Sequence, residues 1–221
     1  MKPGRILVAV DASPLSLAAL EAAARLGDRF GAVVDGLYVE DINLAKLAEQ
    51  PEGTLISVLH ARRHADPHLL ITQALRLQVT QARRSFEATL GGRQPAGSFM
   101  VRRGQVVSEM LVAAAQADLV VLGWHGAAPS DRARLGSVAR ALAERCPRPL
   151  LMLGRRDGEA LRLAVLAGDT PAIAIATALG GEAPLLRLGR LTEAGPQHLL
   201  VTSLAEGLDA TPGSLLLVPE A

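Results

Sequence analysis

The chain has 221 residues, of which 49% are hydrophobic and only 2% are aromatic. This aliphatic content supports a large buried core and excludes an intrinsically disordered protein. The formal charge of +1 excludes a global basic field for binding nucleic acid, and the few aromatic residues exclude a base-stacking platform. At roughly 150 residues per domain, the length predicts about one and a half domains.

The sequence carries no signal for export or for membrane insertion. Cys146 is the only cysteine, which excludes an intrachain disulfide and fits a reducing compartment. The apolar run Ile6–Val10 is too short for a signal peptide, and no stretch approaches the roughly 18 apolar residues of a membrane span. We therefore expect a cytoplasmic protein that has no membrane span and binds no nucleic acid.

The first elements predict a β–α–β unit. Arg5–Val10 is an aliphatic run typical of a strand that is buried on both faces of a parallel sheet. Ser13 is a good N-cap, Pro14 suits the first helical position and Gly31 is a typical helix stop, so a helix is expected between them. The run Ala32–Val39 then predicts a second strand.

Strands and helices continue to alternate through the rest of the first 154 residues. Residues 42–68 are expected to form an interrupted helical insertion. The remaining expected elements are helices at 43–50, 54–65, 69–90, 106–116 and 137–145, and strands at 98–102, 118–122 and 149–153. This alternation predicts an α/β fold with a doubly wound, parallel, five-stranded sheet.

The pattern begins again, in shorter form, after residue 158. Three later runs match earlier strands: Arg162–Ala167 matches Arg5–Val10, His198–Thr202 matches 118–122, and Ser214–Val218 matches 149–153. These matches favour a degenerate internal repeat, although any two buried β–α units look somewhat alike. Residues 124–148 have only 204–213 as a counterpart, and Gly168 stands where Asp11 would be. The second unit is therefore expected to lack a ligand-binding loop.

The segment after the fourth expected strand has a distinctive glycine spacing. Gly123 and Gly126 are followed, after nine residues, by Gly136 and Ser137. Glycines at the carboxyl end of a strand let the backbone approach a ligand closely, and Ser137 can cap a helix whose N-terminus suits an anion. Asp11 ends the first strand, at the sheet edge where ligands of open α/β sheets bind. Together these features predict a nucleotide pocket.

This spacing, G-x2-G-x9-G-[S/T], resembles the ATP-binding branch of the universal stress protein family. Two further features resemble the family: a first strand that ends in Asp11 before Ser13, and a second strand that ends at Val39. The resemblance covers about residues 4–154, and residues 160–219 resemble the family more weakly. It implies the universal stress protein fold, which is adenine nucleotide hydrolase-like, and ATP as the ligand together with Mg²⁺ or Mn²⁺.

The resemblance also implies how the chain divides. Residues 1–154 would form a nucleotide-binding domain of the universal stress type, with the helical insertion at about 42–68. Residues 159–221 would form a truncated, degenerate copy without the phosphate loop. Proteins of this type commonly dimerise through their last strands, which implies a homodimer or an intramolecular pseudo-dimer in which 214–218 pairs with 149–153.

The family likeness assigns roles to particular residues. Asp11 would lie near the ribose and phosphates or bind the metal, and Val39 would contact adenine through its backbone. Arg132 and Arg134 lie inside the loop and could neutralise phosphate charge, while His125 could donate to a phosphate, act as an acid–base group or only order the loop. The full expected binding set is Ala9, Val10, Asp11, Val39, Leu122, Gly123, His125, Gly126, Arg132, Arg134, Gly136, Ser137 and Val138.

The resemblance favours a regulatory role, in which ATP occupancy controls conformation or binding of an unidentified protein partner during stress. Segment 42–68 would then be the moving or partner-facing element. One alternative is a slow ATPase or nucleotidyl transferase that uses Asp11 and His125. Another is an interaction module whose pocket is vestigial because the bulky Trp124 blocks it.

Overall fold

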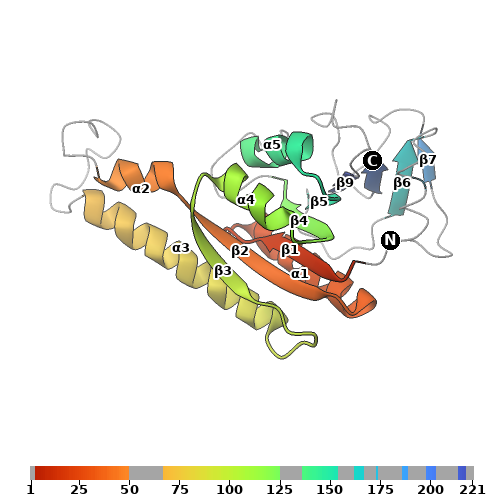
Figure 1. Ribbon diagram of the computed structural model, residues 1–221, viewed down its shortest axis with the longest axis horizontal. Coiled ribbons are helices and arrows are strands. Elements are labelled where there is room, and N and C mark those ends of the chain that lie inside the picture. The colour runs from red at the N-terminus through yellow and green to blue at the C-terminus, as the bar shows by residue number, and fades with distance from the viewer. Residues whose placement is uncertain are drawn as a thin grey trace.

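The computed structural model describes residues 3–49, 67–124 and 136–153, followed by the short segments 162–166, 173, 186–188, 198–202 and 214–217. In the described part of the first 153 residues strands alternate with helices, apart from the consecutive helices α2 and α3, and the described segments after residue 153 include four strands (Figure 1). None of the helices in these described ranges is both long and apolar enough to cross a membrane.

The elements up to residue 153 have the following bounds. The strands are β1 Arg5–Ala9, β2 Val33–Asp41, β3 Phe99–Gly104, β4 Leu119–Gly123 and β5 Leu150–Leu153. The helices are α1 Pro14–Phe30, α2 Ile42–Glu49, α3 Pro67–Leu90, α4 Val106–Ala114 and α5 Ser137–Arg145. The later strands are β6 Arg162–Leu166, β7 Leu186–Leu188, β8 His198–Thr202 and β9 Ser214–Leu217.

The first five strands form the expected parallel sheet, in the order β3-β2-β1-β4-β5. The sheet is larger than the predicted five strands, because it continues beyond β5 through β9, β8, β6 and β7. β9 runs antiparallel to β5, with Leu150 opposite Leu217 and Met152 opposite Leu215. The predicted pairing of 214–218 with 149–153 is therefore confirmed, and it is the contact that extends the sheet.

Two apolar clusters cover the two faces of the sheet. One contains residues of α4 and α5 with Leu7 of β1, and the other contains residues of α1 and α3 with Ile6 and Val8. Successive side chains of a strand point to opposite faces, which explains this division of neighbouring residues. Helices on both faces agree with the doubly wound α/β class (Figure 1). The last strand joins both clusters, since Leu216 belongs to one and Leu217 to the other.

Helix α1 begins and ends where its sequence predicts. The hydroxyl of Ser13 accepts a hydrogen bond from the N–H of Ser16 at 3.1 Å, and Pro14 occupies the first turn. At the other end Gly31 has φ 66°, a left-handed conformation that glycine adopts without steric cost. These two caps place the start of α1 directly beside the carboxyl end of β1.

Several elements differ by one or two residues from the sequence-based expectation, and two of these differences have a clear physical reason. β2 runs to Asp41 rather than Val39, because Glu40 and Asp41 pair with the end of β3 at the partly exposed edge of the sheet. α3 begins at Pro67, two residues earlier than predicted, since proline fits the first position of a helix. The expected helix at 54–65 lies outside the described residues.

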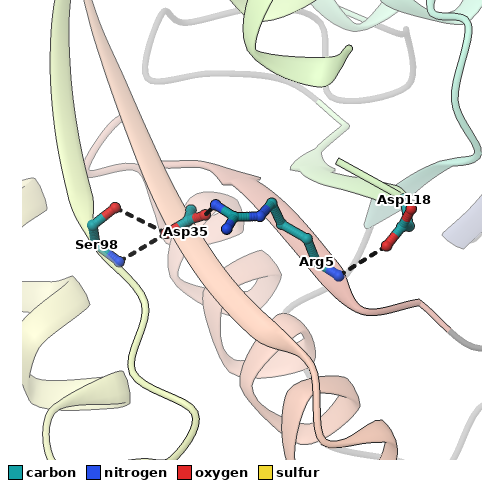
Figure 2. Close-up of polar contacts among 4 residues, drawn as sticks. All are labelled: Arg5, Asp35, Ser98 and Asp118. Carbon is teal, nitrogen blue, oxygen red and sulfur yellow. Dashed lines mark hydrogen bonds and ion pairs between the residues drawn. The ribbon is translucent and has the colours of Figure 1, made fainter. Parts of the chain in front are cut away.

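A polar network ties the first strands together at the amino edge of the sheet. The buried carboxylate of Asp35 in β2 accepts from Arg5 Nη1 at 2.6 Å, and from the N–H and hydroxyl of Ser98 at 2.8 and 2.9 Å. Asp118 Oδ2 accepts from the N–H groups of Gly4 and Arg5, each at 2.9 Å. Figure 2 shows the contacts among Arg5, Asp35, Ser98 and Asp118. They fix the strand starts, so the opposite, carboxyl edge is held in register.

Candidate functional site

A cavity of about 550 Å³ lies at the carboxyl edge of β1, β2 and β4. This volume falls within the range of small-molecule sites, roughly 300–1,000 Å³. Each of the five helices that the structure describes contributes to its wall. The described lining residues are Ala9, Val10, Asp11, Ser13, Ser16, Leu37, Tyr38, Val39, Asp41, Leu44, Leu75, Gln78, Val106, Met110, Leu122, Gly123, Gly136, Ser137, Val138, Ala139 and Leu142.

The structure brings most of the sequence-predicted site residues together at this cavity. The predicted residues that line it are Ala9, Val10, Asp11, Val39, Leu122, Gly123, Gly136, Ser137 and Val138. They come from three strand ends and from the start of α5. The other four predicted residues, His125, Gly126, Arg132 and Arg134, lie outside the described residues.

The turn between β1 and α1 holds Asp11 in place. Asp11 Oδ1 accepts from the N–H of Ser13 at 3.0 Å, and the N–H of Asp11 donates to Ser16 Oγ at 3.0 Å. Between them Ala12 has φ 61°, an uncommon conformation for a residue with a side chain. The turn is therefore closely constrained, and it fixes one oxygen of the Asp11 carboxylate.

The start of α5 forms another part of the wall. The N-cap is Gly136, without a side-chain hydrogen bond, and Ser137 is the first helical residue, so the prediction that Ser137 caps this helix is wrong. The N–H of Gly136 donates instead to the carbonyl of Trp124 at 3.0 Å, which joins the two ends of segment 125–135. A helix leaves the N–H groups of its first turn without intrahelical partners, and these groups favour an anion.

Trp124 is packed in the core and does not line the cavity. Trp124 is 5% exposed and belongs to the apolar cluster that contains residues of α4, α5 and β5. Its N–H donates to the carbonyl of Leu153 at 2.8 Å, which continues the alignment of β4 with β5. The structure therefore does not support the hypothesis that Trp124 blocks the pocket.

The wall formed by α2 and α3 was not predicted from the sequence. It contains Leu44, Leu75 and Gln78, and Gln78 Oε1 accepts a hydrogen bond from the Tyr38 hydroxyl at 3.2 Å. Burial raises the pKa of the Tyr38 phenol above its ordinary value, and the nearby charges of Glu40 and Asp11 raise it further. The phenol is therefore neutral at physiological pH and keeps its proton for donation.

Helix α4 supplies an apolar part of the wall through Val106 and Met110. These residues are four positions apart and lie on one face of the helix. Their only sequence signal is this spacing, which every core-facing helix shows, so sequence reasoning had no means of assigning them to a ligand site. The same holds for Leu44 and Leu75.

The described lining of the cavity contains few charged groups. Among the described lining residues, Asp11 and Asp41 are the charged side chains, and no arginine or lysine is present. Within the described residues there is also no cluster of three or more metal-ligating side chains. The described part of the cavity thus combines apolar walls, two carboxylates and a helix N-terminus, the mixture of apolar surface and few polar groups that is typical of small-molecule sites.

Comparisons with known proteins agree with this architecture. The model of the universal stress protein family matches residues 3–154. Universal stress protein UspA from Lactobacillus plantarum is 20% identical, covers 69% of this chain and 98% of its own, and gives a TM-score of 0.51. A universal stress protein from Archaeoglobus fulgidus DSM 4304 is 11% identical, covers 100% of this chain and 97% of its own, and gives a TM-score of 0.56.

A third similar structure is described as a universal stress protein in complex with cAMP. It is 18% identical, covers 69% of this chain and 98% of its own, and gives a TM-score of 0.41. A search of curated proteins finds no match. Because the family model spans more than half of the sequence, the chain belongs to the universal stress protein family.

Proposed function

We propose that this protein binds an adenine nucleotide, with ATP as its main ligand, in the cavity at the carboxyl edge of the sheet. The observation that carries the proposal is the convergence of the predicted residues. Residues as far apart in sequence as Ala9, Val39 and Val138 line one cavity of suitable volume. The resemblance to the family implied contact with the same nucleotide for each of them.

The ligand would lie across the ends of β2, β1 and β4. Its phosphates would meet the N–H groups at the start of α5, beside Gly136 and Ser137, because a helix N-terminus stabilises negative charge. Its ribose would lie near Asp11, and its adenine would contact the backbone of Val39. The apolar side chains of α4 would cover the base.

A divalent metal fits this site in one particular way. Asp11 Oδ1 already accepts a hydrogen bond from Ser13, which leaves Oδ2 to face a cation. Magnesium commonly takes one or two carboxylates and completes its shell with substrate phosphates and water. We propose that Mg²⁺ or Mn²⁺ would be held by Asp11 and the bound nucleotide, where it would reduce repulsion between the phosphates and the carboxylates.

We further propose that occupancy controls the position of α2 and α3 and, through them, contact with a protein partner. Leu44 of α2 lines the cavity and is 48% exposed, so a ligand would cover apolar surface that now faces water. A ligand shifts a conformational equilibrium only when it binds two states with different affinities. A wall that the ligand contacts directly can supply that difference.

The last third of the chain would serve as a built-in partner, as an intramolecular pseudo-dimer. Outward from the β5–β9 junction, the strands run β9-β8-β6-β7 on one side and β5-β4-β1-β2 on the other. This mirrored order agrees with the matching of strands in the sequence, and it supports division into a domain of residues 1–154 and a shortened copy at 159–221. In this proposal β9 covers the β5 edge that a second chain would otherwise pair with.

A change at the start of α5 tests the nucleotide site. Ser137→Glu adds a carboxylate where the phosphates would bind, while negative charge in the first turn stabilises the helix itself. We expect ATP affinity to fall by about tenfold or more, as one unfavourable charge contact of about 1.4 kcal/mol would cause. Isothermal titration calorimetry measures the affinity, and fluorescence of the single tryptophan, Trp124, gives a second readout.

Ser108→Glu is the matched control. Ser108 also lies in the first turn of a helix, α4, but it is exposed and does not line the cavity. It should leave ATP affinity unchanged. Wild-type protein that binds no ATP, or equal affinities for both variants and the wild type, would contradict the proposed site.

A further inference from the structure

A hydrogen bond joins Tyr38 of β2 to Gln78, which stands among apolar side chains in the wall formed by α2 and α3. The hydroxyl of Tyr38 donates to Gln78 Oε1 at 3.2 Å, and both residues line the cavity. Their neighbours on this wall, Leu44 and Leu75, offer no hydrogen bonds. The bond occupies one lone pair of the amide oxygen and leaves the second lone pair and the NH₂ group of Gln78 to a ligand.

We propose that Gln78, oriented by Tyr38, recognises the hydrogen-bonding edge of the nucleobase and makes the site select adenine over guanine. This inference rests on the nucleotide-binding function proposed above. It adds a specificity-determining residue that the glycine motif does not include, and it assigns a binding role to α3.

The topology puts this pair at the base end of the cavity. In the sheet, β2 and β4 lie on opposite sides of β1. The start of α5, where the phosphates would bind, follows β4, whereas Tyr38 belongs to β2 and is adjacent to Val39. A nucleotide with its phosphates at α5 therefore extends its base toward Tyr38 and Gln78.

The chemistry of the amide explains the selectivity. A glutamine can pair with adenine through two hydrogen bonds, accepting from the exocyclic N6 amine and donating to a ring nitrogen beside it. Guanine carries an oxygen acceptor in place of that amine, so Gln78 Oε1 would face another acceptor and lose its bond. In the structure the Tyr38 hydroxyl donates to this oxygen, which places Oε1 beside the hydroxyl and leaves the NH₂ group to the ring nitrogen.

The phenol is suited to this orienting role. Burial, with the charges of Glu40 and Asp11, raises the pKa of Tyr38, which keeps the hydroxyl protonated at physiological pH. Tyr38 is also buried between β2 and α3, in the same cluster as Ala82 and Phe86. Its ring therefore cannot swing away when a ligand enters, and the amide is held before binding.

The test compares ATP with GTP, which share their phosphates and differ in the base. Equilibrium binding in the presence of Mg²⁺ should show the wild type preferring ATP by about tenfold or more, as expected for one good bidentate contact. Gln78→Met keeps the length of the side chain and removes its hydrogen bonds, so this preference should fall to about twofold or less. Tyr38→Phe should lower the preference while changing the shape of the wall very little.

Gln81→Met is the matched control, because Gln81 lies on the same helix, is exposed and does not line the cavity. It should keep the wild-type preference. Wild type that binds neither nucleotide would refute the proposed function itself. A wild type that binds ATP and GTP equally, or a preference that survives in both Gln78→Met and Tyr38→Phe, would refute this inference and leave nucleotide binding intact.

Discussion

Single buried polar residues anchor the edge of the sheet that lies opposite the cavity. Asp35 is 4% exposed, yet its carboxylate has three hydrogen bonds, from Arg5 and Ser98. A buried carboxylate is costly unless it is paired in this way, and removing it leaves its donors unsatisfied. Asp28 offers a contrast, because its ion pair with Arg93 joins side chains that are 53% and 40% exposed.

We predict that Asp35→Ala lowers the free energy of unfolding by about 2 kcal/mol, because the Ser98 N–H loses its acceptor and Arg5 loses its partner. Asp28→Ala should cost about 0.5 kcal/mol or less, as expected for an exposed ion pair. Urea unfolding followed by circular dichroism measures both. Equal losses in the two variants would show that the Asp35 network does not stabilise the sheet.

At the scale of elements, the sequence predicted best where local chemistry decides the structure. The bounds of α1 follow from Ser13, Pro14 and Gly31, each of which acts on its own backbone. The strands of the parallel sheet follow from continuous aliphatic runs. The predicted β2 was too short. Glu40 and Asp41 extend the strand by pairing with β3, and this tertiary contact cannot be predicted from two acidic residues in the sequence.

The candidate site divides in the same way. Asp11 and the glycines come directly after strands, so their position at the sheet edge follows from chain order and parallel topology. Leu44 and Gln78 reach the cavity only because α2 and α3 pack over the end of β2. Their sequence pattern is that of any amphipathic helix, and it contains no signal for a ligand.

The position of Leu44 in the cavity wall leads to a prediction about α2. ATP should slow amide hydrogen exchange in residues 42–49, because the ligand would contact Leu44 and favour the state in which α2 is packed. The central amides of α1, around Leu20 in the core, serve as the internal reference for local effects. Unchanged exchange in α2 at saturating ATP would contradict control of this wall by the nucleotide.

At the scale of the whole molecule, the nine described strands form one sheet, in which a region that carries the cavity is joined to a later region through β5 and β9. The sequence had predicted about one and a half domains, and the second region lacks a counterpart for most of residues 124–148. That stretch contains the part of the glycine motif that follows Gly123, and the start of α5. We therefore expect the proposed nucleotide site once per chain, in the first region.

Native mass spectrometry of the full chain with ATP and Mg²⁺ tests this central claim most directly, because it counts bound nucleotides per chain. We expect one adenine nucleotide per chain, with associated Mg²⁺, either retained from purification or acquired on addition of ATP. Two nucleotides per chain would contradict the loss of the second site. A chain that stays free of nucleotide at saturating ATP would contradict the nucleotide-binding function itself.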